Sequence, residues 1–160
     1  MENVVNNLTA ISAWMGQIGL GLCLGLAAMG SALGIGAAGQ AAAGAWAKDA
    51  RAGRPLNFKY IILTGMPLSQ TIYAFVLMLV SLKAATYSGD VTNIGAICGI
   101  GLGCGVGQLG SAWMQGKIGA SAIRAMSESE GKPFAFSIIA MGIAETIGLF
   151  SFVFMLLMMP

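Results

Sequence analysis

The feature that most limits the fold of this chain is a set of four long apolar stretches separated by short polar connections. We expect them at about Ile11–Ala47, Tyr60–Tyr87, Thr92–Met126 and Phe134–Met159. Each is long enough to span a membrane as a helix, which takes about 20 mostly apolar residues. Only 9% of the residues are charged, whereas a soluble domain has about 25%. The sequence therefore predicts an all-α membrane protein with four transmembrane helices.

The chain is expected to divide into a short polar leader at residues 1–10, a helical hairpin at 11–87 and a second helical hairpin at 88–160. The first apolar stretch is too long for a signal peptide and lacks a basic leader and a typical cleavage site. No soluble domain fits into the connections between the helices. The whole chain is thus expected to act within the membrane.

Composition argues against several classes of function. The net charge of +2 is too small to suggest a nucleic-acid partner. Cys23, Cys98 and Cys104 lie in apolar stretches without metal-ligand spacing, so we expect free thiols that pack as small residues. The chain has no His and no phosphate-binding loop, so it is not expected to be an enzyme by itself.

Basic residues concentrate at two of the three connections, while the middle one has only Lys83, accompanied by Asp90. Cytoplasmic loops of membrane proteins carry an excess of Lys and Arg. The connections near residues 48–59 and 127–133 are therefore predicted to be cytoplasmic, with both termini outside. The basic residues at these two connections are Lys48, Arg51, Arg54 and Lys59 for the first, and Lys117, Arg124 and Lys132 for the third.

The two halves of the chain repeat one another. Their order along the sequence predicts two hairpins in tandem with the same orientation. The position of Glu145 in the second half is held by Gln70 in the first, so we expect one ionisable site per chain. The matching segments are Gly30-Ser31-Ala32 with Gly110-Ser111-Ala112, Gly53-Arg54-Pro55 with Gly131-Lys132-Pro133, and Gln70-Thr71-Ile72 with Glu145-Thr146-Ile147.

Glycines gather in the first and third apolar stretches. In the third, every fourth residue from Gly95 through Gly99, Gly103 and Gly107 is glycine, and the same spacing reaches Gln115. Small residues at this spacing let helix backbones approach closely in membranes. We expect the four glycines to serve helix packing, either in a crowded ring of many copies or in one tightly packed bundle.

Glu145 is the only charged residue in the most apolar stretch, Phe136–Met159. A carboxylate at this depth is costly, rare and usually functional. No basic residue lies nearby in the sequence to neutralise it. A bound proton, a bound metal cation or a charge on another subunit must therefore do so.

Three polar residues are expected at one depth. Gln70, Gln115 and Glu145 each lie ten or eleven residues from the cytoplasmic end of their stretch, or about 15–17 Å into the membrane at ~1.5 Å per residue. Ser69 adjoins Gln70, and Tyr73 shares their helix face. Just before them, Pro67 removes a helical N–H and bends the backbone, which can offer the carbonyl of Met66 to a ligand.

These residues supply the oxygens that hard cations prefer: a carboxylate, amides, a hydroxyl and a carbonyl. One negative charge matches one monovalent cation and leaves the filled site neutral. A proton site would need only Glu145 and one or two acceptors. We therefore expect sodium at Glu145, Gln70, Gln115, Ser69 and the Met66 carbonyl, and keep a proton as the alternative.

Together these segments resemble the duplicated four-helix c or K subunit, the rotor-ring proteolipid of V-type rotary ATPases. The resemblance covers nearly the whole chain and is closest to the sodium-transporting bacterial branch. It implies that Met66, Ser69, Gln70, Gln115 and Glu145 hold the ion. The motifs that carry it are Gly30-Ser31-Ala32, Met66-Pro67-Leu68-Ser69-Gln70-Thr71-Ile72-Tyr73, Gln115-Gly116-Lys117 and Ala144-Glu145-Thr146.

The chain departs from the family pattern at three places beside the site. Ser69 stands where the family has a Thr, which keeps the hydroxyl. Leu68 and Thr71 each stand where a Gly would be expected, which changes packing without removing an oxygen. The resemblance further implies that Tyr73 hydrogen-bonds the Glu145 carboxylate.

The resemblance also implies partners and a location. Identical copies would form a ring in contact with lipid, in a bacterial cell membrane. The ring would turn with central-stalk subunits, and Glu145 would exchange its ion before an arginine of a stator membrane subunit.

Alternatives of other classes are a small proton-coupled exporter, which acts as a dimer, and a gap-junction-like or fusion pore.

Overall fold

The computed structural model describes residues 2–88 and 93–160, and within them every regular element is helical. Asp90 and Thr92, expected in the middle connection and at the start of the third span, lie outside the described residues. Three helices are unbroken: α1 (Glu2–Arg51), α5 (Ile94–Glu128) and α6 (Phe134–Leu157). Between α1 and α5 run α2 (Lys59–Gly65), a 3₁₀ turn (Met66–Leu68), α3 (Ser69–Leu77), a π-helical turn (Met78–Leu82) and α4 (Lys83–Thr86).

Four helical segments are long and apolar enough to cross a membrane: Trp14–Arg51, Lys59–Thr86, Ile94–Glu128 and Phe134–Leu157. The predicted all-α fold with four transmembrane helices is thereby confirmed, and the chain is a multi-pass integral membrane protein. From Glu2 onward the polar leader forms part of α1. Neither Gly nor Pro precedes Gly16, so nothing there breaks the helix.

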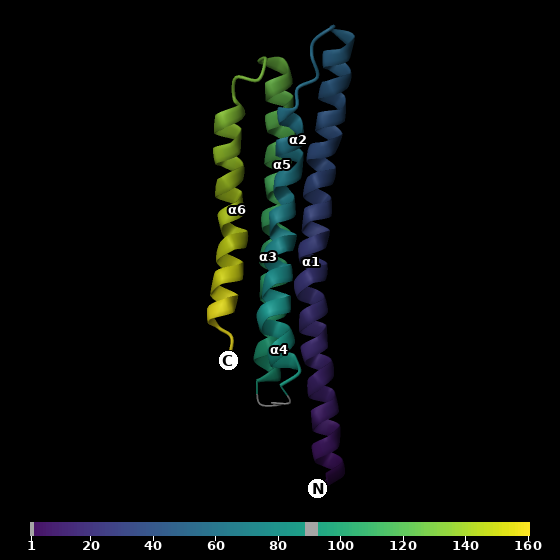
Figure 1. Ribbon diagram of the computed structural model, residues 1–160, viewed down its shortest axis with the longest axis vertical. Helices are drawn as coiled ribbons and strands as arrows, with labels where there is room; N and C mark the ends of the chain where they lie inside the picture. Colours follow the sequence, from purple (N-terminus) through teal and green to yellow (C-terminus); the bar gives the residue numbers. More distant parts are fainter. Residues whose placement is uncertain (1, 89–92) are drawn as a thin grey trace.

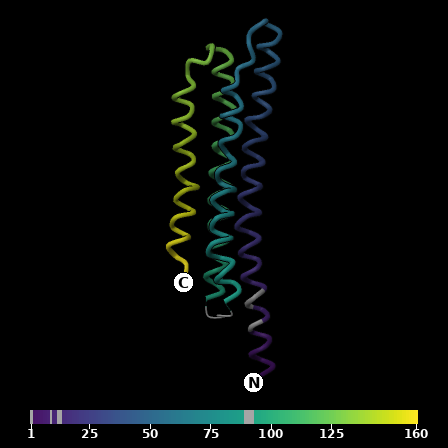
Figure 2. The backbone as a smooth tube through the Cα atoms, in the orientation of Figure 1, coloured from purple at the N-terminus to yellow at the C-terminus, as the bar shows by residue number. Residues whose placement is uncertain are grey.

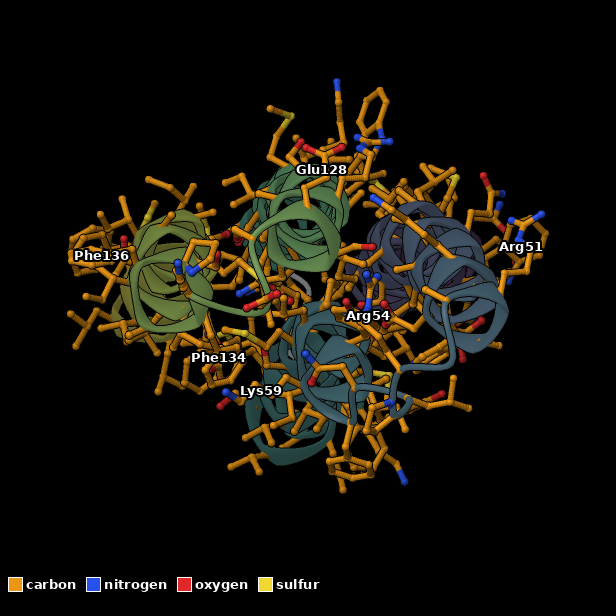
Figure 3. The ribbon with its side chains drawn as sticks, turned by 90° about the horizontal axis from the view of Figure 1, so that it is seen from above. Arg51, Arg54, Lys59, Glu128, Phe134 and Phe136 are labelled. Atoms are coloured by element: carbon orange, nitrogen blue, oxygen red, sulfur yellow. The ribbon has the colours of Figure 1, made fainter. Side chains whose placement is uncertain are left out.

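The four spans run side by side, and α1 projects beyond the others at its N-terminal end (Figure 1). Both termini lie at the end where α4 finishes and α5 begins, while the connections after Arg51 and after Glu128 lie at the opposite end (Figure 2). Seen from that opposite end, α1 and α5 are neighbours, with α6 beyond α5 and the α2–α4 span packed below them (Figure 3). The two hairpins thus share one orientation.

The second span is irregular around Pro67, as expected for a residue that cannot donate a backbone hydrogen bond. The 3₁₀ turn Met66–Leu68 replaces one turn of α-helix there. The Ser31 hydroxyl on α1 donates to the Pro67 carbonyl at 2.5 Å, and Thr71 Oγ1 donates to Ser31 Oγ at 2.7 Å. A hydroxyl from the neighbouring helix therefore satisfies backbone next to the bend.

Glycines bring α1 and α5 into backbone contact. A Cβ on Gly101 or Gly116 would collide with the backbone of α1 at Gly19 or Gly34, and one on Gly30 would collide with Leu109. None of these belongs to the four-residue series expected to serve helix packing.

The glycines of the expected series do not meet the α1 backbone. Gly103 and Gly107 face α6, where an added Cβ would meet Met155 Cε at 2.9 Å and the Ser151 side chain, respectively. Gly95 and Gly99 have open space beside them within the chain. The four-residue spacing therefore does not say which neighbour each glycine meets.

The buried interior consists of two apolar clusters with a polar layer between them. One cluster, near the termini, includes Cys23, Ala74 and Cys104; the other, toward the basic loops, includes Ala38, Leu63, Ile123 and Met141. All three cysteines are free. The layer between the clusters contains the buried side chains of Ser31, Gln70, Gln108, Ser111 and Gln115. This layer positions the candidate site.

Candidate ion-binding site

Glu145 lies midway along α6, half-buried, with its carboxylate turned toward α3 and α5. The Tyr73 hydroxyl on α3 donates to Glu145 Oε1 at 3.0 Å. The side-chain amide of Gln115 on α5 donates to Glu145 Oε2 at 3.3 Å. Two helices therefore hold the two carboxylate oxygens in a defined orientation.

Two fully buried glutamines connect this carboxylate to the second span. Gln70 Nε2 on α3 donates to Gln115 Oε1 at 3.1 Å, and Gln115 Nε2 also donates to the Met141 carbonyl on α6 at 3.0 Å. Gln115 thus contacts both α3 and α6, and its amide links Gln70 to Glu145. Equal depth in the membrane explains why these three side chains meet although they come from three spans.

Two further oxygens gather beside the side-chain amide oxygen of Gln70. Ser69 Oγ lies 3.0 Å from the Met66 carbonyl oxygen and 3.2 Å from Gln70 Oε1. The 3₁₀ turn that contains Pro67 places Met66 and Ser69 three residues apart on one side of the span. A carbonyl, a hydroxyl and an amide oxygen therefore converge next to the Gln70–Gln115–Glu145 network.

The structure thus brings together all the residues that the sequence singled out as ion ligands. Tyr73 lies at the edge of the group: its hydroxyl bonds Glu145, and its aromatic ring stacks on Phe152 of α6 with centroids 6.0 Å apart. The glycines at 95, 99, 103 and 107 stay outside the polar group.

Sequence analysis missed two buried polar residues of α5. The Ser111 hydroxyl accepts from Gln70 Nε2 at 3.1 Å and donates to the Ala144 carbonyl at 2.8 Å, which supports both Gln70 and the turn before Glu145. Gln108 donates to the Gly148 carbonyl at 2.7 Å, and its Oε1 has no hydrogen-bond partner among the described residues. Their spacing of four and seven residues from Gln115 was the available signal, since it places all three on one helix face.

The chemistry of the group suits ion binding. The described residues contain no cluster of three or more His, Cys, Asp or Glu side chains that could hold a metal ion. Glu145 is instead a single carboxylate among neutral oxygens, within an apolar span. Such a carboxylate is costly in hydrocarbon unless one positive charge neutralises it.

This combination of four spanning helices and one membrane carboxylate defines a class of small proteins that carry ions through the membrane. The family model for the C subunit of ATP synthase matches residues 18–81 and again residues 98–158. The chain belongs to this family. A comparison with curated proteins gave no match.

Family membership fixes the general role. The C subunits of ATP synthases are non-catalytic rotor proteins that form a ring and translocate ions against a stator, with a stalk attached. The two matched segments each contain one hairpin, in agreement with the internal repeat. The expected ring of helical hairpins and the non-catalytic role are thereby confirmed.

Proposed function

We propose that this chain is the rotor-ring subunit of a V-type rotary ATPase and that each copy carries one sodium ion at Glu145. The observation that carries the proposal is the convergence of amide, hydroxyl and carbonyl oxygens on one membrane carboxylate. ATP hydrolysis in a soluble head would turn the ring through central-stalk subunits. Each Glu145 would then exchange its ion at the stator.

The duplication supports the V-type assignment. The chain contains two hairpins of the C-subunit type, yet only the second has an acid at the site, because Gln70 occupies the equivalent position in the first. Gln70 still takes part in the site, since its side-chain amide hydrogen-bonds Gln115 and Ser111. In this proposal the first hairpin contributes neutral ligands and the second contributes the charge.

The oxygen set supports sodium over the proton. A proton on Glu145 would be satisfied by one acceptor, and Tyr73 and Gln115 already provide polar contacts to both carboxylate oxygens. The oxygens at Met66, Ser69 and Gln70 would then have no role in ion transport. Hard cations need several such oxygens, and Ser69 Oγ lies only 3.0 and 3.2 Å from the other two.

Charge neutrality explains how a filled site can face lipid while the ring turns. An ionised carboxylate in hydrocarbon is strongly unfavourable, whereas Glu145 with one Na⁺ is neutral overall. A stator arginine facing Glu145 would stabilise the empty carboxylate at the exchange point. Because the Glu145 side chain is only half-buried between the helices, its ion can leave without the helices separating.

The basic residues support an orientation with the 48–59 and 127–133 connections in the cytoplasm of a bacterial cell. In the structure Lys59 Nζ lies 5.1 Å from the Phe134 ring centroid, so the two connections meet at one end of the molecule. Arg54 forms an ion pair with the buried carboxylate of Asp49 at 2.5 Å, which ties the first connection to α1. The central stalk would contact this end.

Equilibrium binding of radioactive sodium to purified rings tests the proposal. We expect one bound ion per chain, lost in Glu145→Gln. Gly44→Leu is a matched control because it changes a residue of α1 that lies far from the site in sequence and has open space beside it. Rings that translocate ions but bind no sodium would show that the site carries protons.

A further inference from the structure

The bend in the second span presents one candidate ion ligand and is itself held by another helix. The 3₁₀ turn Met66–Leu68 provides the Met66 carbonyl oxygen, which lies 3.0 Å from Ser69 Oγ. The next carbonyl along the chain, that of Pro67, accepts a hydrogen bond from the Ser31 hydroxyl of α1 at 2.5 Å. Two consecutive carbonyls of one turn therefore serve different purposes: one belongs to the candidate ion site and the other is attached to α1.

The direction of the hydrogen bonds around Ser31 follows from the chemistry of its partners. A carbonyl oxygen only accepts, so the Ser31 hydroxyl donates its one hydrogen to Pro67. Ser31 Oγ then accepts from the Thr71 hydroxyl, which lies 2.7 Å away. Thr71 thus donates to Ser31, and Ser31 donates to the backbone of the turn. Because Ser31 is buried, water is not at hand to replace either bond.

The ring of Pro67 is also packed against α1. Gly34 lies three residues after Ser31 and shares its face of the helix. A Cβ at Gly34 would meet Pro67 Cβ at 2.9 Å, and Pro67 is fully buried. The bend is therefore fixed to α1 both by the proline ring and by the proline carbonyl.

The proline couples the directions of the two carbonyls. Its ring fixes φ of Pro67 at about −65°, so the direction of the Met66 carbonyl relative to the Pro67 carbonyl depends on one remaining rotation, ψ of Pro67. The 3₁₀ hydrogen bond from the Ser69 N–H to the Met66 carbonyl restricts that rotation as well. Attaching the Pro67 carbonyl to Ser31 therefore also sets the direction of the Met66 carbonyl.

The second hairpin has no such hydrogen-bond chain at the equivalent place. Thr146 corresponds to Thr71 in the internal repeat, but its exposed hydroxyl donates to the Ile143 carbonyl of its own helix at 2.7 Å. Ser111, the counterpart of Ser31, accepts from the Gln70 amide instead of from a threonine. The chain from Thr71 through Ser31 to Pro67 thus belongs to the hairpin that supplies the neutral oxygens.

We infer that Ser31 and Thr71 are positioning residues for the sodium ion. Thr71 holds the Ser31 hydroxyl, and Ser31 holds the turn so that the Met66 carbonyl is directed toward the oxygens of Ser69 and Gln70. Neither residue touches the ion. The inference rests on the proposed function and names residues outside the ligand set on which sodium affinity depends. A proton on Glu145 does not need the Met66 carbonyl, so sodium affinity should depend on these two residues and proton affinity should not.

Removal of the Thr71 hydroxyl tests the inference. Thr71→Val keeps the shape of the side chain and removes one hydrogen bond, so sodium affinity should fall about two- to tenfold. Thr71→Ser keeps the hydroxyl and should bind sodium like the wild type. Thr146→Val is the matched control, because its hydroxyl bonds only its own helix, and it should leave the affinity unchanged. Equilibrium binding of radioactive sodium to purified rings measures all three variants.

A second readout separates positioning from general packing. In sodium-free buffer, the pH dependence of carbodiimide labelling of Glu145 reports how tightly the carboxylate holds its proton. This profile should be the same in Thr71→Val and in the wild type. A profile that shifts together with the sodium affinity would indicate a general disturbance of the site and overturn the positioning role.

A double-mutant cycle tests whether Thr71 acts through Ser31. Ser31→Ala removes the bond to the Pro67 carbonyl and should lower sodium affinity at least as much as Thr71→Val does. Adding Thr71→Val to Ser31→Ala should cause no further loss, because residues that act through one another are not additive. Losses that add up would contradict the hydrogen-bond chain.

The outcomes distinguish this inference from the proposed function. Wild-type rings that bind sodium, together with Thr71→Val and Ser31→Ala rings that bind it equally well, would overturn the inference and leave the function intact. Failure of both variants to form rings would also overturn it, since the two hydroxyls would then serve assembly. Wild-type rings that bind no sodium would overturn the proposed function and the inference with it.

Discussion

The Tyr73 hydroxyl donates to Glu145 Oε1 at 3.0 Å and thereby joins the second span to the fourth. One end of Tyr73 is apolar and stacks on Phe152, while the other bonds the one acid of the apolar stretches. The bond crosses from the hairpin without a carboxylate to the hairpin that has one. The two repeats therefore cooperate at a single site.

Replacing Tyr73 by Phe should weaken sodium binding about tenfold while the subunits still assemble. The aromatic side chain keeps its stack on Phe152, and only the hydrogen bond is lost, which at ~1.5 kcal/mol for a charged acceptor corresponds to this factor. Sodium titration of purified rings measures the effect. An unchanged affinity would mean that Tyr73 only packs against α6.

Glu145→Gln should abolish modification of the membrane part by a hydrophobic carbodiimide. Such reagents attack protonated carboxyls in apolar surroundings, and the other acids lie at or near the connections and the N-terminus. Mass spectrometry of labelled rings identifies the modified residue. Labelling that persists in the variant would place the reactive carboxyl elsewhere.

Gln115→Leu should lower sodium affinity about ten- to hundredfold, since the loss of a contact to a charged group is worth ~1.5–3 kcal/mol. Gln108→Leu is the matched control: Gln108 is an equally buried amide on the same helix, but its bonds go to Gly148 rather than to Glu145. Its affinity for sodium should stay near that of the wild type. Equal losses in both variants would indicate a general packing defect.

Gly107→Leu should destabilise the chain itself by about 1–3 kcal/mol, because the added side chain would overpack the contact with Ser151 on α6. Gly95→Leu should leave the single chain unaffected, since Gly95 has open space beside it. Thermal unfolding of detergent-solubilised monomers compares the two. A more stable Gly107→Leu than Gly95→Leu would contradict the packing of α5 on α6.

The sequence was sufficient to predict the four spans, the tandem repeat and the common depth of Gln70, Gln115 and Glu145. Apolar length and position along a helix determine these features directly. The sequence could not predict which helix each glycine contacts. Gly103 and Gly107 pack on α6, whereas Gly101 and Gly116, which lie on another side of α5, meet α1. Helix rotation depends on all contacts at once, and one periodic series does not fix it.

The candidate site, too, could be predicted only in part from the sequence. The polar residue types and their depth were enough to predict that Gln70, Gln115 and Glu145 lie together. Ser111 and Gln108 were missed because a Ser among glycines and a second amide in an apolar helix resemble ordinary packing residues. Their contacts with Gln70, Ala144 and Gly148 emerge only when α5 and its neighbours are placed together.

The central claim is that sodium and a proton compete for Glu145, and the rate of carbodiimide labelling measures that competition most directly. Wild-type rings are labelled across a series of sodium concentrations and pH values, with potassium keeping the ionic strength constant. We predict that sodium slows labelling, and more effectively as the pH rises, because Glu145 must lose its proton to bind the ion. Labelling that sodium leaves unchanged even at high pH would contradict the claim and identify a proton-carrying ring.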